Sequence, residues 1–171
     1  MNKQKIHTMK ELSKTIGISR PTLARFFEDE SSVLPSTAKK IKERLEGVDY
    51  VYNFLATRQN RKSTGLIGVI VPRFEDLFFA TLLDSIEIAA RRAGFTMITQ
   101  SSHGEKEFEE QAVQKLRSMN VDGAIIAPLG FEGNPDAFVS ASEDFPIVFA
   151  DSHPSRSLPH ADFVGTDNSN S

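Results

Sequence analysis

The chain has 171 residues, of which 39% are hydrophobic and 25% charged, a composition typical of a soluble folded protein. The absence of cysteine excludes disulfides, thiolate metal sites and cysteine nucleophiles, and the four histidines show no metal-ligand spacing. No apolar run reaches the roughly 20 residues that cross a bilayer, and the N-terminus lacks the apolar segment of a signal peptide. We therefore expect a cytoplasmic protein without a metal or other cofactor.

The net charge of −3 is distributed unevenly along the chain. Residues 1–62 carry 13 Lys and Arg against 7 Asp and Glu, a net charge of +6, whereas the remaining residues carry a net charge of −9. A basic segment followed by an acidic one favours a polyanionic partner for the first segment. A solvated charged surface is the alternative, so the interpretation depends on the pattern of residues in the basic segment.

The stretch TMKE predicts that a helix begins after Thr8. The hydroxyl of Thr8 can accept a hydrogen bond from a free amide of the first turn, and Glu11 can return one to Thr8. Leu12 and Ile16 are four residues apart and share a face. Gly17 then ends the helix, because glycine adopts the left-handed conformation at little cost.

A second helix follows after a short turn. Ser19 can cap it, and Pro21 lies in its first turn, where no intrahelical amide bond is needed. A third helix is predicted from Pro35 to Glu46, because apolar residues recur there with helical spacing. The second helix is expected to bury Leu23, Phe26 and Phe27, and the third Ala38, Ile41 and Leu45.

This order of helices is typical of a helix-turn-helix, in which the second helix lies in the major groove of DNA and contacts bases with its first residues. Arg20, Pro21 and Arg25 are expected on the face opposite Leu23 and Phe27. An arginine there can donate two hydrogen bonds to guanine, worth about 1–3 kcal/mol of discrimination. A small helical protein-interaction module with solvent-facing arginines is the alternative.

Residues 51–63 are too polar for a core helix and are interpreted as a hinge between two domains, residues 1–50 and 64–171. In the second domain, near-continuous apolar strands alternate with amphipathic helices, which indicates an α/β parallel sheet covered on both faces. The predicted strands are 66–72, 95–100, 121–128, 147–151 and 162–167, and the predicted helices are 77–93 and 105–119, the latter burying Phe108, Ala112, Leu116 and Met119.

Ligands of parallel sheets bind beyond the carboxyl ends of the strands. No glycine-rich phosphate turn follows the first strand, which disfavours a dinucleotide enzyme. Phe78 and Phe79 begin a helix there, and their rings could stack on the apolar face of a sugar or base. Asp151 ends an apolar strand and could accept hydrogen bonds from ligand hydroxyls. A core position for Phe79 and a capping role for Asp151 are the alternatives.

With helix-turn-helix, hinge and parallel sheet in this order, the sequence resembles the lac repressor/gal repressor family of bacterial transcription regulators. The resemblance extends along nearly the whole chain. It is carried by TMKELSKTIGISRPTLARFF at 8–27, GLIGVIVPRFEDLFFATLLDSIEIAARRAGF at 65–95, VDGAIIAP at 121–128 and FVGTDNSNS at 163–171.

The resemblance implies a helix-turn-helix head, a hinge and a lobe like that of periplasmic binding proteins. It implies a regulator without enzymatic activity, expected to be a repressor, that dimerises on a pseudopalindromic DNA operator and responds to a small metabolite such as a sugar. The implied base contacts are Arg20, Pro21 and Arg25, with Ser19, Thr22, Thr8 and Asn53 near phosphates and Leu55 and Gln59 at the minor groove. The implied effector contacts are Phe78, Phe79 and Asp151, with Arg73 and Phe74 nearby.

Three positions depart from the family pattern. Gln59 stands where the family usually has a leucine that wedges into the minor groove, and an amide rewards the unstacking of bases poorly. Leu55 lies one turn earlier and is an alternative wedge. Tyr52 replaces a proline, and Arg73 replaces an acidic residue, which leaves the effector class open.

Family members are roughly twice as long as this chain, in keeping with two lobes that each need a core. We therefore expect the chain to be the N-terminal half of such a regulator, with an incomplete effector cleft. Two alternatives are a small-ligand-binding module without a role on DNA and a truncated fragment without function.

Overall fold

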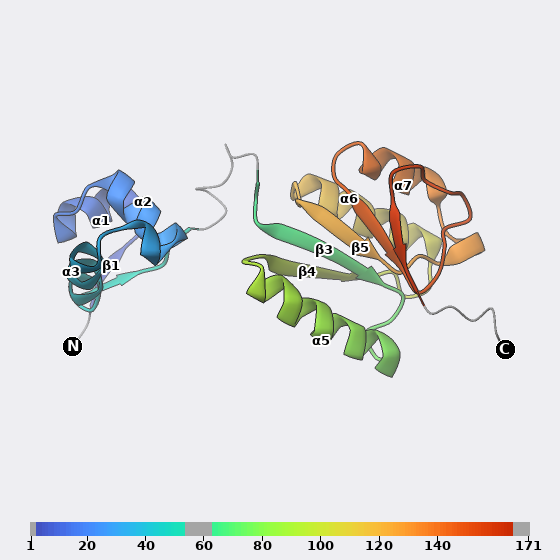
Figure 1. The fold of residues 1–171 in the computed structure, drawn as a ribbon, viewed down its shortest axis with the longest axis horizontal. Coiled ribbons are helices and arrows are strands. Elements are labelled where there is room, and N and C mark those ends of the chain that lie inside the picture. Colours follow the sequence, from blue (N-terminus) through green and yellow to red (C-terminus); the bar gives the residue numbers. More distant parts are fainter. Residues whose placement is uncertain (1–2, 54–62, 166–171) are drawn as a thin grey trace. The chain divides into compact units, whose positions relative to one another are not determined.

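The structure is a computed structural model that describes residues 3–53 and 63–165 (Figure 1). The chain divides into two compact units, residues 1–57 and 58–171. We call the described residues of the first unit, 3–53, the head, and those of the second, 63–165, the body. Neither contains a helix that is long and apolar enough to span a membrane.

The head contains the three predicted helices and two short strands that the sequence did not predict. Its elements are β1 (Gln4–Ile6), α1 (Met9–Ile16), α2 (Arg20–Glu28), a 3₁₀ helix (Glu30–Ser32), α3 (Pro35–Leu45) and β2 (Val48–Tyr50). The two strands pair in parallel, with Ile6 opposite Tyr50. Three residues are too few to show the alternation by which a strand is recognised in a sequence.

The ends of α1 and the start of α2 confirm the capping predictions. The Thr8 hydroxyl accepts a hydrogen bond from the Glu11 amide at 3.1 Å, and the Glu11 carboxylate accepts one from the Thr8 amide at 3.3 Å. Gly17 follows α1 with a φ of 63°, in the left-handed region that favours glycine. The Ser19 hydroxyl accepts a hydrogen bond from the Thr22 amide at 3.4 Å.

One apolar core holds the head together. Leu12 and Ile16 of α1, Leu23 of α2, Ile41 of α3 and Ile6 of β1 are buried in it. Full burial of such a side chain stabilises the folded state by about 1.5–3 kcal/mol. Three further residues that were predicted to be buried lie at the margin of this core and are half-buried. They are Phe26, Phe27 and Leu45.

The body contains the five predicted strands, the two predicted helices and a further α-helix. Its elements are β3 (Leu66–Val71), α5 (Leu77–Arg92), β4 (Thr96–Ser101), α6 (Lys106–Ser118), β5 (Gly123–Ile126), a 3₁₀ helix (Gly130–Glu132), α7 (Pro135–Ser142), β6 (Ile147–Ala150) and β7 (Asp162–Val164). The last strand, predicted over 162–167, ends at Val164, and residues 166 and 167 lie outside the described residues. The sequence did not predict α7, because Asn134, Pro135 and Asp136 at its start are typical of a loop.

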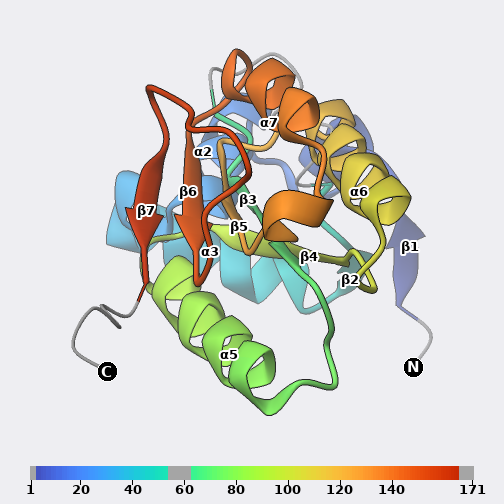
Figure 2. The ribbon, with the colours of Figure 1, turned by 90° about the vertical axis from the view of Figure 1, so that its right-hand side faces the viewer.

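The five strands form one parallel sheet in the order β4-β3-β5-β6-β7, which confirms the predicted fold class. Helices cover both faces of the sheet, with α5 on one face and α6 and α7 on the other (Figures 1 and 2). On the side of α5, Val69, Val71, Phe79 and Ala127 form a buried cluster. Because all strands run in one direction, their carboxyl ends lie along a single edge.

The buried face of α6 differs from the prediction at Phe108. Ala112 and Leu116 are buried as expected, but Glu109 is fully buried and Phe108 is 46% exposed, with its ring against His103. A helical face that contains residues 112 and 116 can continue to either residue 108 or residue 109. The sequence favoured 108 as the buried position only because phenylalanine is apolar and glutamate is charged. The fold instead uses the carboxylate of Glu109 on the inner face.

Gly68 in β3 gives the first test of this packing. We predict that Gly68→Ala destabilises the body by about 1–3 kcal/mol, because the added methyl group would overlap with the fully buried side chain of Leu116. Gly123→Ala is the matched control, since its methyl group would lie 3.6 Å or more from Pro146.

Urea unfolding followed by far-UV circular dichroism measures both free energies. The only tyrosines of the chain, Tyr50 and Tyr52, lie in the head, so their fluorescence identifies the transition of the head separately. Equal costs for the two alanine variants would contradict the prediction.

Candidate nucleic-acid interface and ligand-binding edge

α2 presents the predicted base-contacting residues to solvent. Leu23 faces the core and is fully buried, whereas Arg20, Pro21 and Arg25 are exposed, so the predicted facing of this helix is confirmed. Within the described residues, neither arginine forms an ion pair with an acidic side chain. Both guanidinium groups can therefore donate hydrogen bonds to a partner that approaches this face.

Side chains of both other helices hold the turn before α2. The Ser13 hydroxyl of α1 donates a hydrogen bond to the Ile18 carbonyl at 2.7 Å. The Arg44 guanidinium of α3 donates one to the Ile16 carbonyl at the end of α1. The Ile16 carbonyl, at the helix end, lacks a partner within α1, so the bond from Arg44 also satisfies a group that would otherwise need water. The two bonds fix the direction in which α2 leaves the turn.

The predicted phosphate-contacting residues of the head lie mainly at helix starts. Ser19 and Thr22 lie at the start of α2, with their hydroxyl oxygens 2.7 Å apart, and Thr8 precedes α1. Free amides at a helix start favour a phosphate there. Asn53 is exposed and is the last described residue of the head.

The predicted minor-groove residues Leu55 and Gln59 lie outside the described residues. All the other predicted DNA-binding residues belong to the head. The structure therefore brings the base and phosphate candidates together on one unit, and it leaves the minor-groove candidates as a prediction.

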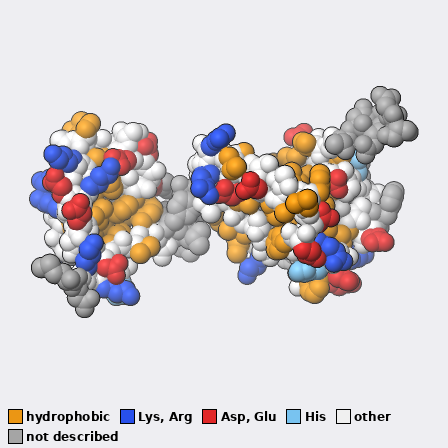
Figure 3. All heavy atoms as spheres, turned by 90° about the horizontal axis from the view of Figure 1, so that it is seen from below, with side chains coloured by type: hydrophobic (Ala, Val, Ile, Leu, Met, Phe, Trp, Pro, Cys, Tyr) orange, Lys and Arg blue, Asp and Glu red, His pale blue; other side chains and the backbone are white. Residues whose placement is uncertain are grey.

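Some basic residues of the head already have partners. Lys42 binds Glu30 at 2.6 Å, and Lys39 lies 4.0 Å from Glu43. Exposed pairs of this kind contribute only about 0–1 kcal/mol, so they can be exchanged for phosphates at little cost. Charged side chains of both signs are mixed on the surface in Figure 3. The candidate interface is therefore located by α2 and not by charge alone.

In the body, the start of α5 lies at the carboxyl end of β3. Asp76 caps this helix, since its carboxylate accepts a hydrogen bond from the Phe78 amide at 2.8 Å. Phe78 is 52% exposed, whereas Phe79 is only 9% exposed and packs with Val69 and Val71. The two rings meet edge to face at 5.1 Å. Phe78 is available to a ligand, and Phe79 supports it from the core.

The remaining effector candidates are exposed at the same edge of the sheet. Arg73 pairs with Glu75 at 3.6 Å, and Phe74 is 44% exposed. Asp151 follows β6 with a φ of 70°, and its amide donates a hydrogen bond to the Val164 carbonyl at 3.0 Å. The backbone thus holds Asp151 in place while its side chain remains exposed. β5 lies between β3 and β6, so Asp151 is two strands away from the phenylalanines.

Hydrogen bonds tie the loops of this edge to one another. The hydroxyl of Ser101, the last residue of β4, donates to the Pro72 carbonyl after β3 at 3.0 Å. The Ser152 hydroxyl after β6 donates to the Pro128 carbonyl after β5 at 3.1 Å. Neighbouring loops are therefore fixed in pairs before any ligand binds.

Glu109 fixes the loop after β5, and sequence reasoning missed it. Its carboxylate accepts hydrogen bonds from the amides of Leu129 at 2.8 Å and Asn134 at 3.2 Å. A methyl group on Gly133 would collide with the same carboxylate. Burial raises the pKa of Glu109 above its ordinary value, and the two backbone hydrogen bonds oppose this effect. In the sequence of this loop, the glycine at position 133 is the one feature that is related to the Glu109 carboxylate, because it leaves room for it.

We predict that Glu109→Gln changes the pH dependence of the stability of the body. The pKa of Glu109 is raised by folding, so the stability that this group contributes is fully present below its unfolded pKa of 4.5 and is lost as the pH rises through the folded pKa. Relative to the wild type, the free energy of unfolding of the glutamine variant should therefore increase as the pH rises from 4 to 7.5.

Urea unfolding at several pH values measures this difference. Glu110→Gln is the matched control, because the neighbouring carboxylate is exposed and accepts a hydrogen bond from the Asn134 side chain and from no backbone amide of the described residues. If the stability curves of wild type and Glu109→Gln stay parallel over this range, the buried carboxylate does not titrate as proposed.

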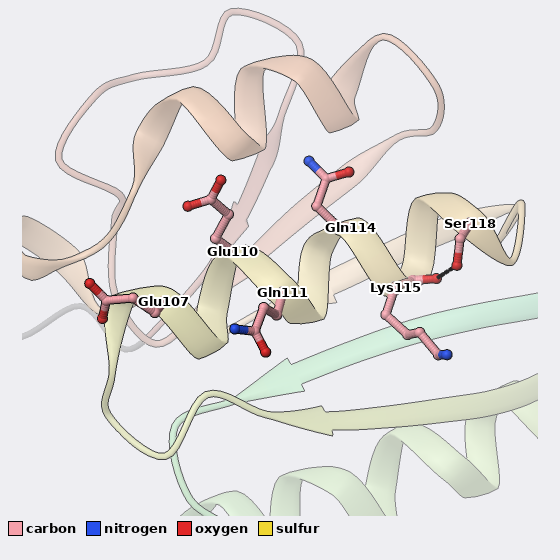
Figure 4. A pocket seen from close by; sticks show the side chains of 6 residues that line it. All are labelled: Glu107, Glu110, Gln111, Gln114, Lys115 and Ser118. Carbon is pink, nitrogen blue, oxygen red and sulfur yellow. Dashed lines mark hydrogen bonds between the residues drawn. The ribbon is translucent and has the colours of Figure 1, made fainter.

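A shallow hollow on the outer surface of α6 is not part of this edge. It is lined by exposed polar side chains of one helix, which point in different directions and do not converge (Figure 4). The Ser118 hydroxyl bonds the Lys115 carbonyl of its own helix at 2.7 Å. The lining residues are Glu107, Glu110, Gln111, Gln114, Lys115 and Ser118. Nothing in this arrangement selects a ligand.

Both units match known protein families. Residues 64–164 match the family of periplasmic binding proteins and sugar-binding domains of the LacI family, and residues 1–52 match a helix-turn-helix family. A curated relative is the HTH-type transcriptional regulator PtxS of Pseudomonas putida, which is 29% identical over 94% of this chain and 47% of its own length. The chain spans about half the length of the curated relatives it matches.

Solved structures show the same fold. A LacI-family transcriptional regulator from Silicibacter pomeroyi aligns over 94% of this chain and 47% of its own, with a TM-score of 0.73 and 22% identity. The lac repressor dimer bound to its operator and the anti-inducer ONPF aligns over 85% of this chain and 44% of its own, with a TM-score of 0.68 and 22% identity.

Proposed function

Because this chain belongs to the family of periplasmic binding proteins and sugar-binding domains of the LacI family, we propose that it is part of a transcriptional regulator that binds specific DNA sequences. The observation that carries the proposal is the exposed face of α2 with Arg20, Pro21 and Arg25. The relative PtxS bears the name of an HTH-type transcriptional regulator, which supports it. We assign residues 1–50 to DNA binding, 51–63 to a hinge and 64–171 to the first effector lobe.

We propose that α2 reads bases in the major groove and that the surrounding hydroxyls hold the DNA backbone. Arg20 and Arg25 would donate to base edges, with Pro21 in van der Waals contact. The proposed phosphate contacts are Thr8, Ser19, Thr22 and Asn53, and the proposed minor-groove contacts are Leu55 and Gln59. Such contacts need no catalytic group, and we propose no enzymatic activity.

We further propose that a small molecule such as a sugar binds the carboxyl edge of the sheet. The exposed ring of Phe78 would cover an apolar face of the ligand, and Asp151 would accept hydrogen bonds from its hydroxyls. Arg73 and Phe74 would flank the ligand, and Phe79 would support Phe78. The lac repressor binds its operator as a dimer, and we propose that the full-length form of this protein does the same, as a cytoplasmic repressor.

The affinity for DNA should depend steeply on salt, because the proposed phosphate contacts release counterions. We expect the logarithm of the binding constant to fall linearly with the logarithm of the salt concentration, with a slope of about −0.9 for each phosphate contacted. Fluorescence anisotropy of a labelled duplex titrated with the full chain measures this slope. Arg73→Ala, in the body, should leave the slope unchanged, and a flat response of the wild type would overturn the proposal.

Arg25→Ala should relax base preference, whereas Lys39→Ala should weaken binding to all sequences about equally. Arg25 lies on the exposed face of α2 without an ion pair in the described residues, while Lys39 lies on α3 beside Glu43. The loss for Arg25→Ala should be about 1–3 kcal/mol at a single base pair. Selection of bound duplexes from a random pool compares the two variants. An equal loss of preference in both would show that α2 does not read the bases.

A further inference from the structure

An aromatic cluster joins the end of α2 to the segment where the chain leaves the head. The ring of Phe27, in the last turn of α2, lies 4.9 Å from the ring of Tyr52, with 14° between the planes, so the two are stacked. Phe27 also contacts Tyr50 at 5.7 Å and Phe26 at 5.5 Å. The helix proposed to read DNA is therefore in direct contact with residue 52.

This stack holds a segment that the strands do not hold. The pairing of β1 with β2 ends at Tyr50, and residues 51–53 belong to no regular element. Val51 is 81% exposed, so it does not anchor the segment. Tyr52, in the middle of this segment, contacts the head through its half-buried ring.

The ring of Tyr52, and not its hydroxyl, makes the contact. The hydroxyl oxygen is buried without a hydrogen-bond partner in the described part of the chain. A buried hydroxyl without a partner destabilises the folded state, so the hydroxyl does not stabilise the position of Tyr52. The stacked ring stabilises it, because an aromatic pair contributes free energy in addition to that of burying its apolar surface.

We propose that Tyr52 is a positioning residue for DNA binding, which fixes Asn53 relative to α2. The proposal rests on the proposed function of the head. The proposed contacts of α2 and of Asn53 then act on the DNA as one unit, because Phe27 belongs to α2 and stacks on the neighbour of Asn53. Without the stack, Asn53 would need to be positioned at each binding event.

The test uses the full chain and a duplex that the wild type selects from a random pool. Tyr52→Phe keeps the ring and removes the buried hydroxyl, Tyr52→Leu removes the stack, and Val51→Ala is the matched control at an exposed neighbour. The affinity for the duplex, the hydroxyl-radical footprint and the methylation protection of guanines are measured for each. Amide NOE values of Asn53 in the DNA-free protein report the order of the segment directly.

Tyr52→Phe and Val51→Ala should match the wild type in every measurement. Tyr52→Leu should bind about 3-fold to 10-fold more weakly, since an aromatic pair contributes about that factor. It should lower the NOE of Asn53 and shorten the footprint while leaving guanine protection by α2 intact.

Three results would overturn the inference. Tyr52→Leu could leave the footprint and the NOE unchanged, which would show that the stack positions nothing. It could remove guanine protection together with the rest of the footprint, which would show that Tyr52 only maintains the fold of the head. If the wild type selects no sequence and binds no duplex, the proposed function of the head fails together with the inference. Measurements on the wild type alone identify this third result, so it is distinguishable from a failure of the inference by itself.

Discussion

The presentation of α2 depends on the turn that begins at Gly17. Gly17 reverses the chain in the left-handed conformation, and a methyl group at this position would lie 3.3 Å from the Arg44 guanidinium. Arg44 in turn holds the end of α1, and Ser13 holds Ile18 just before α2 begins. A larger residue at 17 would strain the backbone and also displace Arg44, so one glycine determines where the exposed arginines of α2 point.

The two ends of the segment between the units are each attached to an ordered group. On the head, Tyr52 stacks on Phe27. On the body, the Asp122 carboxylate accepts hydrogen bonds from the Ser63 hydroxyl and from the Thr64 and Gly65 amides at 2.6 to 2.8 Å. Burial alone would raise the pKa of Asp122, but these bonds together lower it, so the carboxylate is charged at neutral pH. The last described residues of the head and the first of the body are therefore each held by a side chain of their own unit.

The sequence predicted features that depend on neighbouring residues and missed those that depend on distant ones. The Thr8 cap, the turn at Gly17 and the five strands follow from short patterns, and the structure confirms them. The pairing of β1 with β2 joins segments more than 40 residues apart, and the role of Glu109 depends on a loop 20 residues away. Phe78 and Phe79 are adjacent and identical in type, and only the position of the sheet determines that one is exposed and the other buried.

The carboxyl edge of the sheet combines fixed loops with exposed apolar side chains. Phe74, Leu77 and Phe78 are 44%, 81% and 52% exposed within five residues. A ligand that covers them gains about 25 cal/mol for each Å² buried. Because Ser101, Ser152 and Glu109 already fix the loops, binding loses little free energy in ordering them. The proposed sugar would offer an apolar face to the rings and hydroxyls to Asp151, and this match between exposed rings and a carboxylate is the reason that we propose an amphipathic ligand and not a purely charged one.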